Sequence, residues 1–311
     1  MWRVLPAVLL LGAAPLPAPV ALDLIRSDTL PAKLSDLRFF NGAVPNAGVQ
    51  PYALNTALFS DYTDKDRYLY LPVGTRAVFD ADGLPIFPVG AALIKTFRSG
   101  AVKIETRVML HRASGWVALP YVWQGGDAVL KRAGTRVAVT IRGRAIDYAV
   151  PNVNQCKECH AVDGTMTPIG PKARNLTPGM LGVSAGGIRL PKWGDTAAPI
   201  ESRARAYLDV NCGHCHNPKG AASNSGLNLT WETTSRTALG IGKTPVAAGR
   251  GSGGFLYSID PGHPERSIMV HRMATAEPGV AMPEVGRAMV HDEGVKLVGD
   301  WIAGMKPEIK Q

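Results

Sequence analysis

The sequence lacks several patterns that would assign it to large functional classes. It contains no run of Lys and Arg long enough to indicate nucleic-acid binding. Beyond the N-terminal region, no segment reaches the ~18 consecutive apolar residues of a membrane span, so we expect no stable membrane insertion of the mature chain. The glycine-rich stretch 249–254 has no Lys-Ser/Thr ending, which excludes a phosphate-binding loop there. With 19% charged and 46% hydrophobic residues, the composition is typical of a globular protein.

Residues 1–21 are typical of a cleaved export signal. A short positive start at residues 1–3 precedes an apolar stretch at residues 4–14, followed by Pro and Ala. This core is too short for an ordinary membrane helix. Small residues allow cleavage after Ala14 or after Ala21, and a retained membrane anchor is the alternative. We therefore predict an exported, periplasmic protein.

Cysteine is scarce, and its placement is the most informative feature of the chain. All four cysteines occur in two C-x-x-C-H pentapeptides, the signature of covalent c-type haem attachment. Two thiols at this spacing reach the two vinyl groups on one edge of a haem, and the next histidine can bind the iron. The sequence therefore predicts two covalently attached haem c groups. The first would be held by Cys156, Cys159 and His160, and the second by Cys212, Cys215 and His216.

Two other uses of paired cysteines compete with this interpretation. A zinc site usually has its second pair about 15–20 residues after the first, whereas 52 residues separate Cys159 from Cys212. A pair of redox disulfides would not explain why a histidine follows each pair directly. We favour the dihaem interpretation and keep zinc and disulfides as alternatives.

After the signal, the chain divides into four parts that differ in their residue patterns. Residues 22–50 form a lead-in segment, and residues 51–150 contain short alternating segments separated by turn signals, which indicate an antiparallel sandwich or barrel. A first haem segment is expected at 151–199 and a second haem domain at 200–311. The predicted fold class is α+β: a β-rich N-terminal domain followed by a mainly α-helical dihaem cytochrome c region.

Helical periodicity supports the second part of this prediction. Residues 201–211 place apolar side chains on one face and lead into the second motif. Residues 267–273 and 293–305 show similar patterns, and we expect the last of these helices to pack on the helix before the second motif.

Each haem iron needs a ligand opposite its histidine, and methionine is one common choice. Met282 lies in a loop of small residues before the closing helix, and Pro283 prevents a helix there. We predict Met282 as the ligand of the second iron. Met180, which follows His160 by 20 residues, is the candidate for the first iron. The alternatives for the first iron are an open position or a histidine from elsewhere, namely His111, His263 or His271.

The second half resembles a class I cytochrome c domain, with a helix entering Cys212, a Met282-Pro283 loop and a C-terminal helix containing Trp301. From Pro51 onward the chain resembles a family of bacterial exported dihaem c-type cytochromes of uncharacterised function, typified by a Shewanella protein. One departure is the linker after Leu176, which is short for that family. The matching stretches are 51–62, 87–90, 95–97, 105–107, 121–123, 168–172 and 203–212.

The motifs and the resemblance imply an electron-transfer protein that passes electrons between redox partners through two haems. The net charge of +9 would steer it toward an acidic partner protein, although it also serves ordinary solubility. The alternative is a dihaem peroxidase or oxidase that keeps its first iron open for substrate.

Overall fold

The computed structural model describes residues 18–183 and 187–306. Most of the expected export signal, residues 1–17, therefore lies outside the described residues. Val20 and Ala21, at the end of the expected signal, are buried, with 6% and 7% of their surface exposed. Among the described helices, none is both long enough and apolar enough to cross a membrane.

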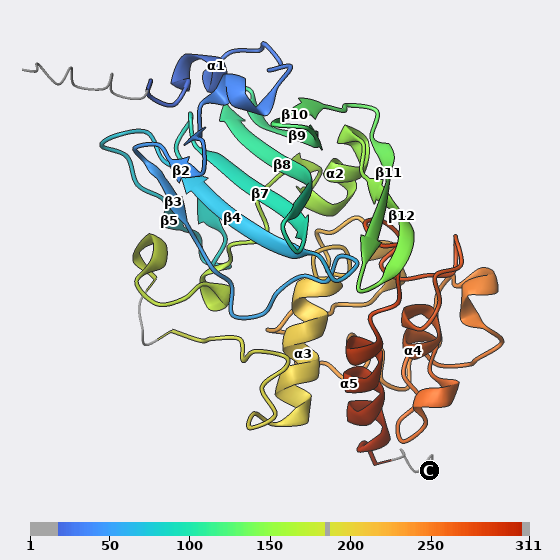
Figure 1. The fold of residues 1–311 in the computed structure, drawn as a ribbon. Helices are drawn as coiled ribbons and strands as arrows, with labels where there is room; N and C mark the ends of the chain where they lie inside the picture. Colours follow the sequence, from blue (N-terminus) through green and yellow to red (C-terminus); the bar gives the residue numbers. More distant parts are fainter. Residues whose placement is uncertain (1–17, 184–186, 307–311) are drawn as a thin grey trace, which may run out of the picture.

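The N-terminal half is built on one antiparallel sheet of six strands (Figure 1). The alternating sequence segments form its central strands, because β-branched and aromatic residues suit a pleated, half-buried surface. In spatial order the strands are β10 (Asp127–Leu130), β9 (Gly115–Gln124), β8 (Val102–Arg112), β7 (Ala92–Ser99), β4 (Asp64–Tyr70) and β3 (Val49–Pro51). A separate hairpin consists of β11 (Thr135–Ile141) and β12 (Arg144–Val150), and the remaining pairs are β1–β2 (Phe40–Asn41, Val44–Pro45), β5–β6 (Val78–Phe79, Pro85–Ile86) and β13–β14 (Ala161–Val162, Thr165–Met166).

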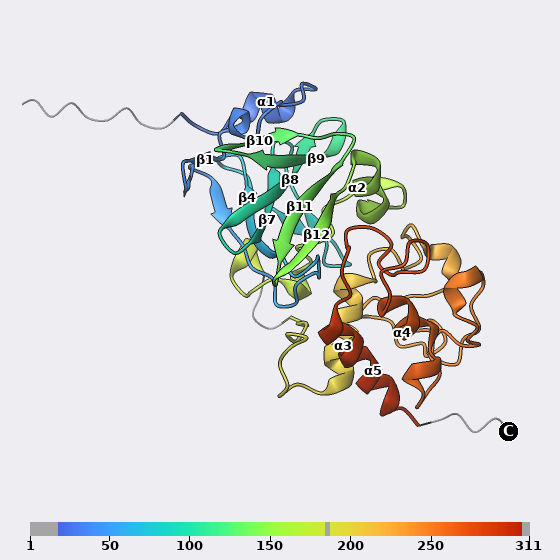
Figure 2. The ribbon, with the colours of Figure 1, turned by 45° about the vertical axis from the view of Figure 1, so that its right-hand side comes forward.

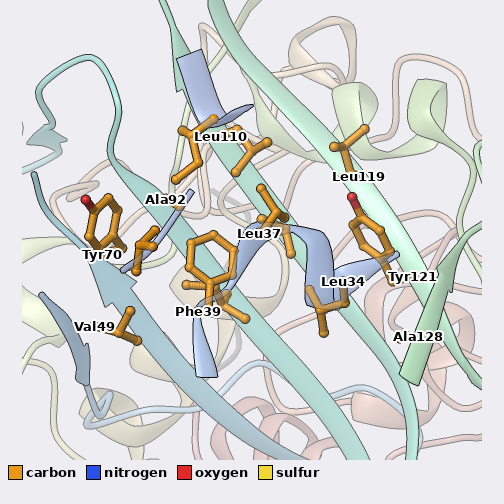
Figure 3. Packing of buried hydrophobic residues seen from close by; sticks show 14 residues of the cluster. Leu34, Leu37, Phe39, Val49, Tyr70, Ala92, Leu110, Leu119, Tyr121 and Ala128 are labelled. Carbon is orange, nitrogen blue, oxygen red and sulfur yellow. The ribbon is translucent and has the colours of Figure 1, made fainter. Parts of the chain in front are cut away.

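The lead-in segment covers one face of the sheet. It contains α1 (Leu22–Arg26) and the 3₁₀ turn η1 (Leu34–Leu37). Leu37 and Phe39 of this segment pack against side chains of β8 and β9, as Figure 3 shows. Burial of each large apolar side chain contributes about 1.5–3 kcal/mol. The cluster's labelled members are Leu34, Leu37, Phe39, Val49, Tyr70, Ala92, Leu110, Leu119, Tyr121 and Ala128.

The opposite face of the sheet is covered by the segment that follows residue 150. Its helix α2 (Val153–His160) lies beside β9 and near the hairpin β11–β12 (Figure 2). Cys156 packs on the apolar side chains of this face, including Leu93 and Met109. The expected sandwich or barrel is therefore wrong: the described residues form one open six-stranded sheet and four separate two-stranded pairs. The lead-in segment and the α2 region cover the two faces of the large sheet.

The expectation of a mainly α-helical haem region is also wrong. After residue 150 the described α-helices are α2, α3 (Ile200–Asn211), α4 (Ile268–Met273) and α5 (Asp292–Ala303), and long irregular segments connect them. Glycine and proline are frequent in those segments, and both residues disfavour a helix interior. Only short 3₁₀ turns interrupt the loops, namely η2 (Ala173–Asn175), η3 (Met180–Gly182), η4 (Ser223–Ser225), η5 (Gly249–Ser252) and η6 (Pro264–Arg266).

The helices expected before the second motif and near the C-terminus do form, and they pack together. Both views show α3 and α5 side by side (Figures 1 and 2). Leu208 of α3 and Val298, Trp301 and Ile302 of α5 share one buried cluster. This pair therefore provides the rigid frame behind the second motif.

Candidate functional site

The first C-x-x-C-H motif forms the last five residues of α2. A reciprocal capping box begins the helix: Gln155 N donates to Asn152 Oδ1 at 2.9 Å, and Asn152 N donates to Gln155 Oε1 at 3.0 Å. Residues three and four apart share a helix face. The helix therefore presents Cys156, Cys159 and His160 together, and all three line one cavity beneath the sheet.

The second motif forms a tight turn at the end of α3. Cys215 N and His216 N both donate to Cys212 O, at 3.1 and 2.9 Å. Gly213 passes so close to the preceding helical turn that a Cβ would lie 2.8 Å from Asp209 O. Glycine is therefore required at this position, and the turn brings Cys212, Cys215 and His216 to one wall of a second cavity.

His160 is held in a defined tautomer. Its Nδ1 lies 3.0 Å from the backbone oxygen of Thr167, which can only accept a hydrogen bond. Nδ1 therefore carries the proton. The lone pair remains on Nε2, the atom that is left to bind a metal.

His216 shows the same arrangement with a different partner. Its Nδ1 lies 2.9 Å from Ser225 Oγ. That hydroxyl already donates its hydrogen to Ala222 O at 2.7 Å, so it accepts from His216. Both motif histidines therefore hold the proton on Nδ1 and keep Nε2 available.

Burial keeps both imidazoles neutral. Loss of solvation lowers the pKa of His160 to about 4, with a further contribution from the nearby Lys95. The pKa of His216 also falls to about 4, mainly because of burial and then because of His214. Neutral imidazole is the form that binds transition metals, so at neutral pH neither ring needs to release a proton first.

Two neighbouring cavities receive the two motifs. The first has an empty volume of about 1270 Å³, counted with the part open to solvent, and is lined by all three residues of the first motif. The second, of about 830 Å³ on the same basis, is lined by all three residues of the second motif and by Met282. The structure thus brings Met282 to the cavity of the motif for which it was predicted.

Met180 has a different environment. It lies in the 3₁₀ turn η3, and its sulfur accepts a hydrogen bond from Ala53 N at 3.5 Å. It is not among the residues that line the first cavity. The three alternative histidines also lie elsewhere: His111 stacks on Trp116, His263 pairs with Glu265, and His271 contacts Phe255.

The two motifs meet at their second cysteines. The sulfur atoms of Cys159 and Cys215 and a ring nitrogen of His214 all lie within 4.8 Å of one another. The close contact of the two thiols lowers the pKa of Cys159 and raises that of Cys215. Two thiols and an imidazole at this separation could also hold one metal ion such as zinc.

The first cavity has a strongly cationic lining that the sequence reasoning missed. Five of its lining residues are Lys or Arg, and one is acidic. Burial, followed by repulsion from Arg107 and Arg67, lowers the pKa of Lys95 to about 7. The cationic residues are Arg67, Lys95, Arg107, Lys172 and Arg287, and the acidic one is Asp209.

Sequence patterns gave little signal for these supporting residues. Thr167 and Ser225 orient the motif histidines from loops that follow each motif at different distances. Arg67 and Lys95 lie in strands whose pairing register is not evident from the sequence. No protein-family model, curated protein or solved structure matches this chain.

Proposed function

We propose that this protein is an exported dihaem c-type cytochrome that carries electrons between redox partners. The observation that carries the proposal is the shared state of the two motif histidines. Each lines a cavity together with both cysteines of its own motif, and each hydrogen-bonds through Nδ1 so that Nε2 is left as a ligand. A donor set of two thiols and one neutral imidazole is what covalent haem attachment needs at each site.

In this proposal, two bound haem c groups supply reversible one-electron chemistry. Cys156 and Cys159 form the thioether bonds of the first group, and Cys212 and Cys215 those of the second. His160 and His216 hold the proximal positions, with Thr167 and Ser225 fixing the orientation of each ring. These hydrogen bonds also make the imidazoles more basic, which strengthens binding to iron.

Met282 lines the second cavity with His216 and would supply a thioether ligand to the second haem. A methionine ligand raises the reduction potential of a haem. The closeness of Cys159 and Cys215 places the attachment points of the two groups next to each other. Two haems attached there would be close enough to exchange electrons directly.

One observation favours a second candidate, a dihaem peroxidase or oxidase. None of the described residues lining the first cavity is a methionine. An iron held there by His160 alone would leave a position for a small substrate such as peroxide. An oxidised spectrum separates the candidates: a high-spin first haem that turns over peroxide favours the enzyme, and two low-spin haems favour the carrier.

The decisive experiment counts haems on the intact protein. The full chain is expressed with a cytochrome c maturation system, recovered from the periplasm, and examined by pyridine haemochrome and intact mass. We expect two haem additions, and the double substitutions Cys156→Ser/Cys159→Ser and Cys212→Ser/Cys215→Ser should each remove one.

His214→Asn is the matched control, because it distinguishes haem from zinc. His214 belongs to the Cys159–His214–Cys215 cluster but is not a haem-attachment residue in the proposal. Under the dihaem proposal, His214→Asn keeps both haem additions. A protein that lacks haem, contains zinc and loses that zinc on His214→Asn would refute the proposal.

A further inference from the structure

The strands under the first cavity place cationic side chains directly opposite one another. In the sheet register, Arg67 of β4 pairs with Lys95 of β7, and Lys95 pairs with Arg107 of β8. These strands are neighbours in the centre of the sheet (Figure 1). Cross-strand partners lie on the same face, so the three residues form one row across the sheet. We call Arg67, Lys95 and Arg107 the cationic row.

The two neighbouring rows on this face differ: one contains Lys65, Phe97 and Glu105, and the other is apolar. Two residues further along each strand, the same face has an apolar row of Leu69, Leu93 and Met109, all buried. Cys156 packs on this apolar row. The cationic row is therefore adjacent to the apolar row on which the first motif packs.

Like charges directly opposite each other destabilise a sheet. The carboxylate of Glu105 neutralises the charge of Arg107, whose guanidinium donates hydrogen bonds of 2.6 and 3.0 Å to it. Arg67 donates to a backbone oxygen at 3.3 Å. Within the described part of the chain, Lys95 Nζ has no hydrogen bond or ion pair and lies 5.1 Å from the centre of the Phe97 ring. Two positive charges of the row thus have no acidic partner.

We propose that the cationic row is a carboxylate-binding site that holds the two propionates of the first haem. All three of its residues line the same cavity as Cys156, Cys159 and His160. Two carboxylates would match Arg67 and Lys95, and a carboxylate beside Lys95 would favour its protonated form. Neighbouring strands are about 4.8 Å apart, so the row extends about 10 Å from Arg107 to Arg67. Paired carboxylates and Arg or Lys form strong, charge-assisted hydrogen bonds.

This inference rests on the proposed function, and it gives the β-rich half a role in it. The sheet would be the wall that anchors the polar edge of the first haem, while α2 anchors its vinyl edge. Soluble carboxylates share the same chemistry, so the test must separate a propionate from a dissolved anion.

The test uses the holoprotein after intact mass has shown two haem additions. Lys95→Gln and Arg67→Gln each remove a charge of the row that has no acidic partner, whereas Arg107 is left in place because Glu105 depends on it. Lys103→Gln is the matched control, since Lys103 is exposed on β8 and does not line the cavity. Lys95→Arg keeps the positive charge, so it separates the effect of losing the charge from the effect of changing the side chain.

We expect each Gln variant to lower the potential of one haem, because a nearby positive charge favours the reduced state. A tenfold change in the reduction equilibrium, ~59 mV for one electron, is the expected size. The Met282→Ala variant identifies the other potential as that of the second haem. Resonance Raman should show a shift of the propionate modes in both Gln variants, and no shift in Lys103→Gln or Lys95→Arg.

Three results would overturn the inference while leaving the dihaem proposal intact. One is an unchanged first-haem potential and unchanged propionate modes in both Gln variants. Another is the same shift in Lys103→Gln. The third is a potential that responds to added succinate in the wild type but not in Lys95→Gln, because the row would then hold a dissolved anion. A protein without haem instead refutes the proposed function, and the mass measurement detects this first.

Discussion

Asp61 connects the β-rich half to the loop that carries Met282. Its Oδ1 accepts hydrogen bonds from Ala288 N and Met289 N, each at 2.7 Å, and only 1% of the residue's surface is exposed. The loop 282–289 lines both cavities, and Met282 lies at its start. Removal of the Asp61 acceptor should therefore destabilise the protein and release the methionine together.

The size of the effect follows from these two bonds. Two hydrogen bonds to a charged acceptor would contribute about 3–6 kcal/mol, and the cost of burying the carboxylate reduces this to about 2–4 kcal/mol. Asp61 has a φ of +47°, in the left-handed region, which disfavours alanine. Asp61→Gly is therefore the clean deletion, because glycine adopts this conformation freely. Asp61→Asn keeps an acceptor oxygen and tolerates this φ, so it should cost less than about 1.5 kcal/mol.

Urea unfolding followed by tryptophan fluorescence measures the stability of each variant. If Met282 ligates the second haem as proposed, the charge-transfer band of the oxidised holoprotein should weaken in Asp61→Gly and persist in Asp61→Asn. If Asp61→Gly lies within about 0.5 kcal/mol of the wild type, near the net value of one weak hydrogen bond, or keeps the full band, the assigned role of Asp61 is wrong.

The pH dependence gives an independent check of the same group. Burial, the largest effect, raises the pKa of Asp61 above its ordinary value of 3.8, despite the two backbone hydrogen bonds. For a carboxyl group with a raised pKa, the folded state favours the protonated form. The wild type should therefore lose stability relative to Asp61→Asn as the pH rises from 3.8 through the raised pKa. If the wild type instead gains stability relative to Asp61→Asn over this pH range, the pKa of Asp61 is not raised in the folded state.

Three further predictions follow from single contacts. Arg174→Met removes the partner of buried Asp209 at 2.7 Å, and Trp231 N and Lys172 Nζ remain at 3.0 and 4.0 Å. It should cost about 3 kcal/mol in urea unfolding, the low end for a broken buried pair, whereas a loss below about 1 kcal/mol would show that the pair is not needed. Gly294→Ala places a Cβ against Tyr207 Oη and should destabilise by about 1–3 kcal/mol, seen as a lower thermal midpoint; an unchanged midpoint argues against this close contact. Because residues 20–21 are buried, signal cleavage should occur before them, and an N-terminus after Ala21 by intact mass would contradict this.

Local sequence patterns predicted the individual helices and strands better than the way in which these pack together. Alternation along 135–141 predicted a strand there, and helical periodicity predicted α3 and α5 close to their observed bounds. These signals are local, since they depend on which face of one element is buried. The pairing register of the sheet depends on contacts between distant segments, so neither the single open sheet nor the cationic row could be predicted from the sequence.

The expectation of a mainly helical second half failed for a related reason. The helical patterns cover only a small part of the second half, and residues 217–263 between them contain frequent glycine and polar residues. The apolar side chains of this segment, such as Leu229, Leu239 and Ile259, join the buried cluster of α3 and α5 from irregular backbone. The positions of Thr167 and Ser225 were equally hidden, because each contacts its histidine from a loop whose path is fixed only by tertiary packing.

The two C-x-x-C-H motifs are equivalent in sequence but have different surroundings. The first lies against the sheet in a cavity with five cationic lining residues, and the second lies at the end of α3 in a cavity that includes Met282. Positive charge and a methionine ligand both favour a reduced haem, yet they act through different parts of the chain. If both haems are present, Lys95→Gln and Met282→Ala should therefore change the two potentials separately. The energy difference for electron transfer between the haems would then be set by the sheet on one side and by the Met282 loop on the other.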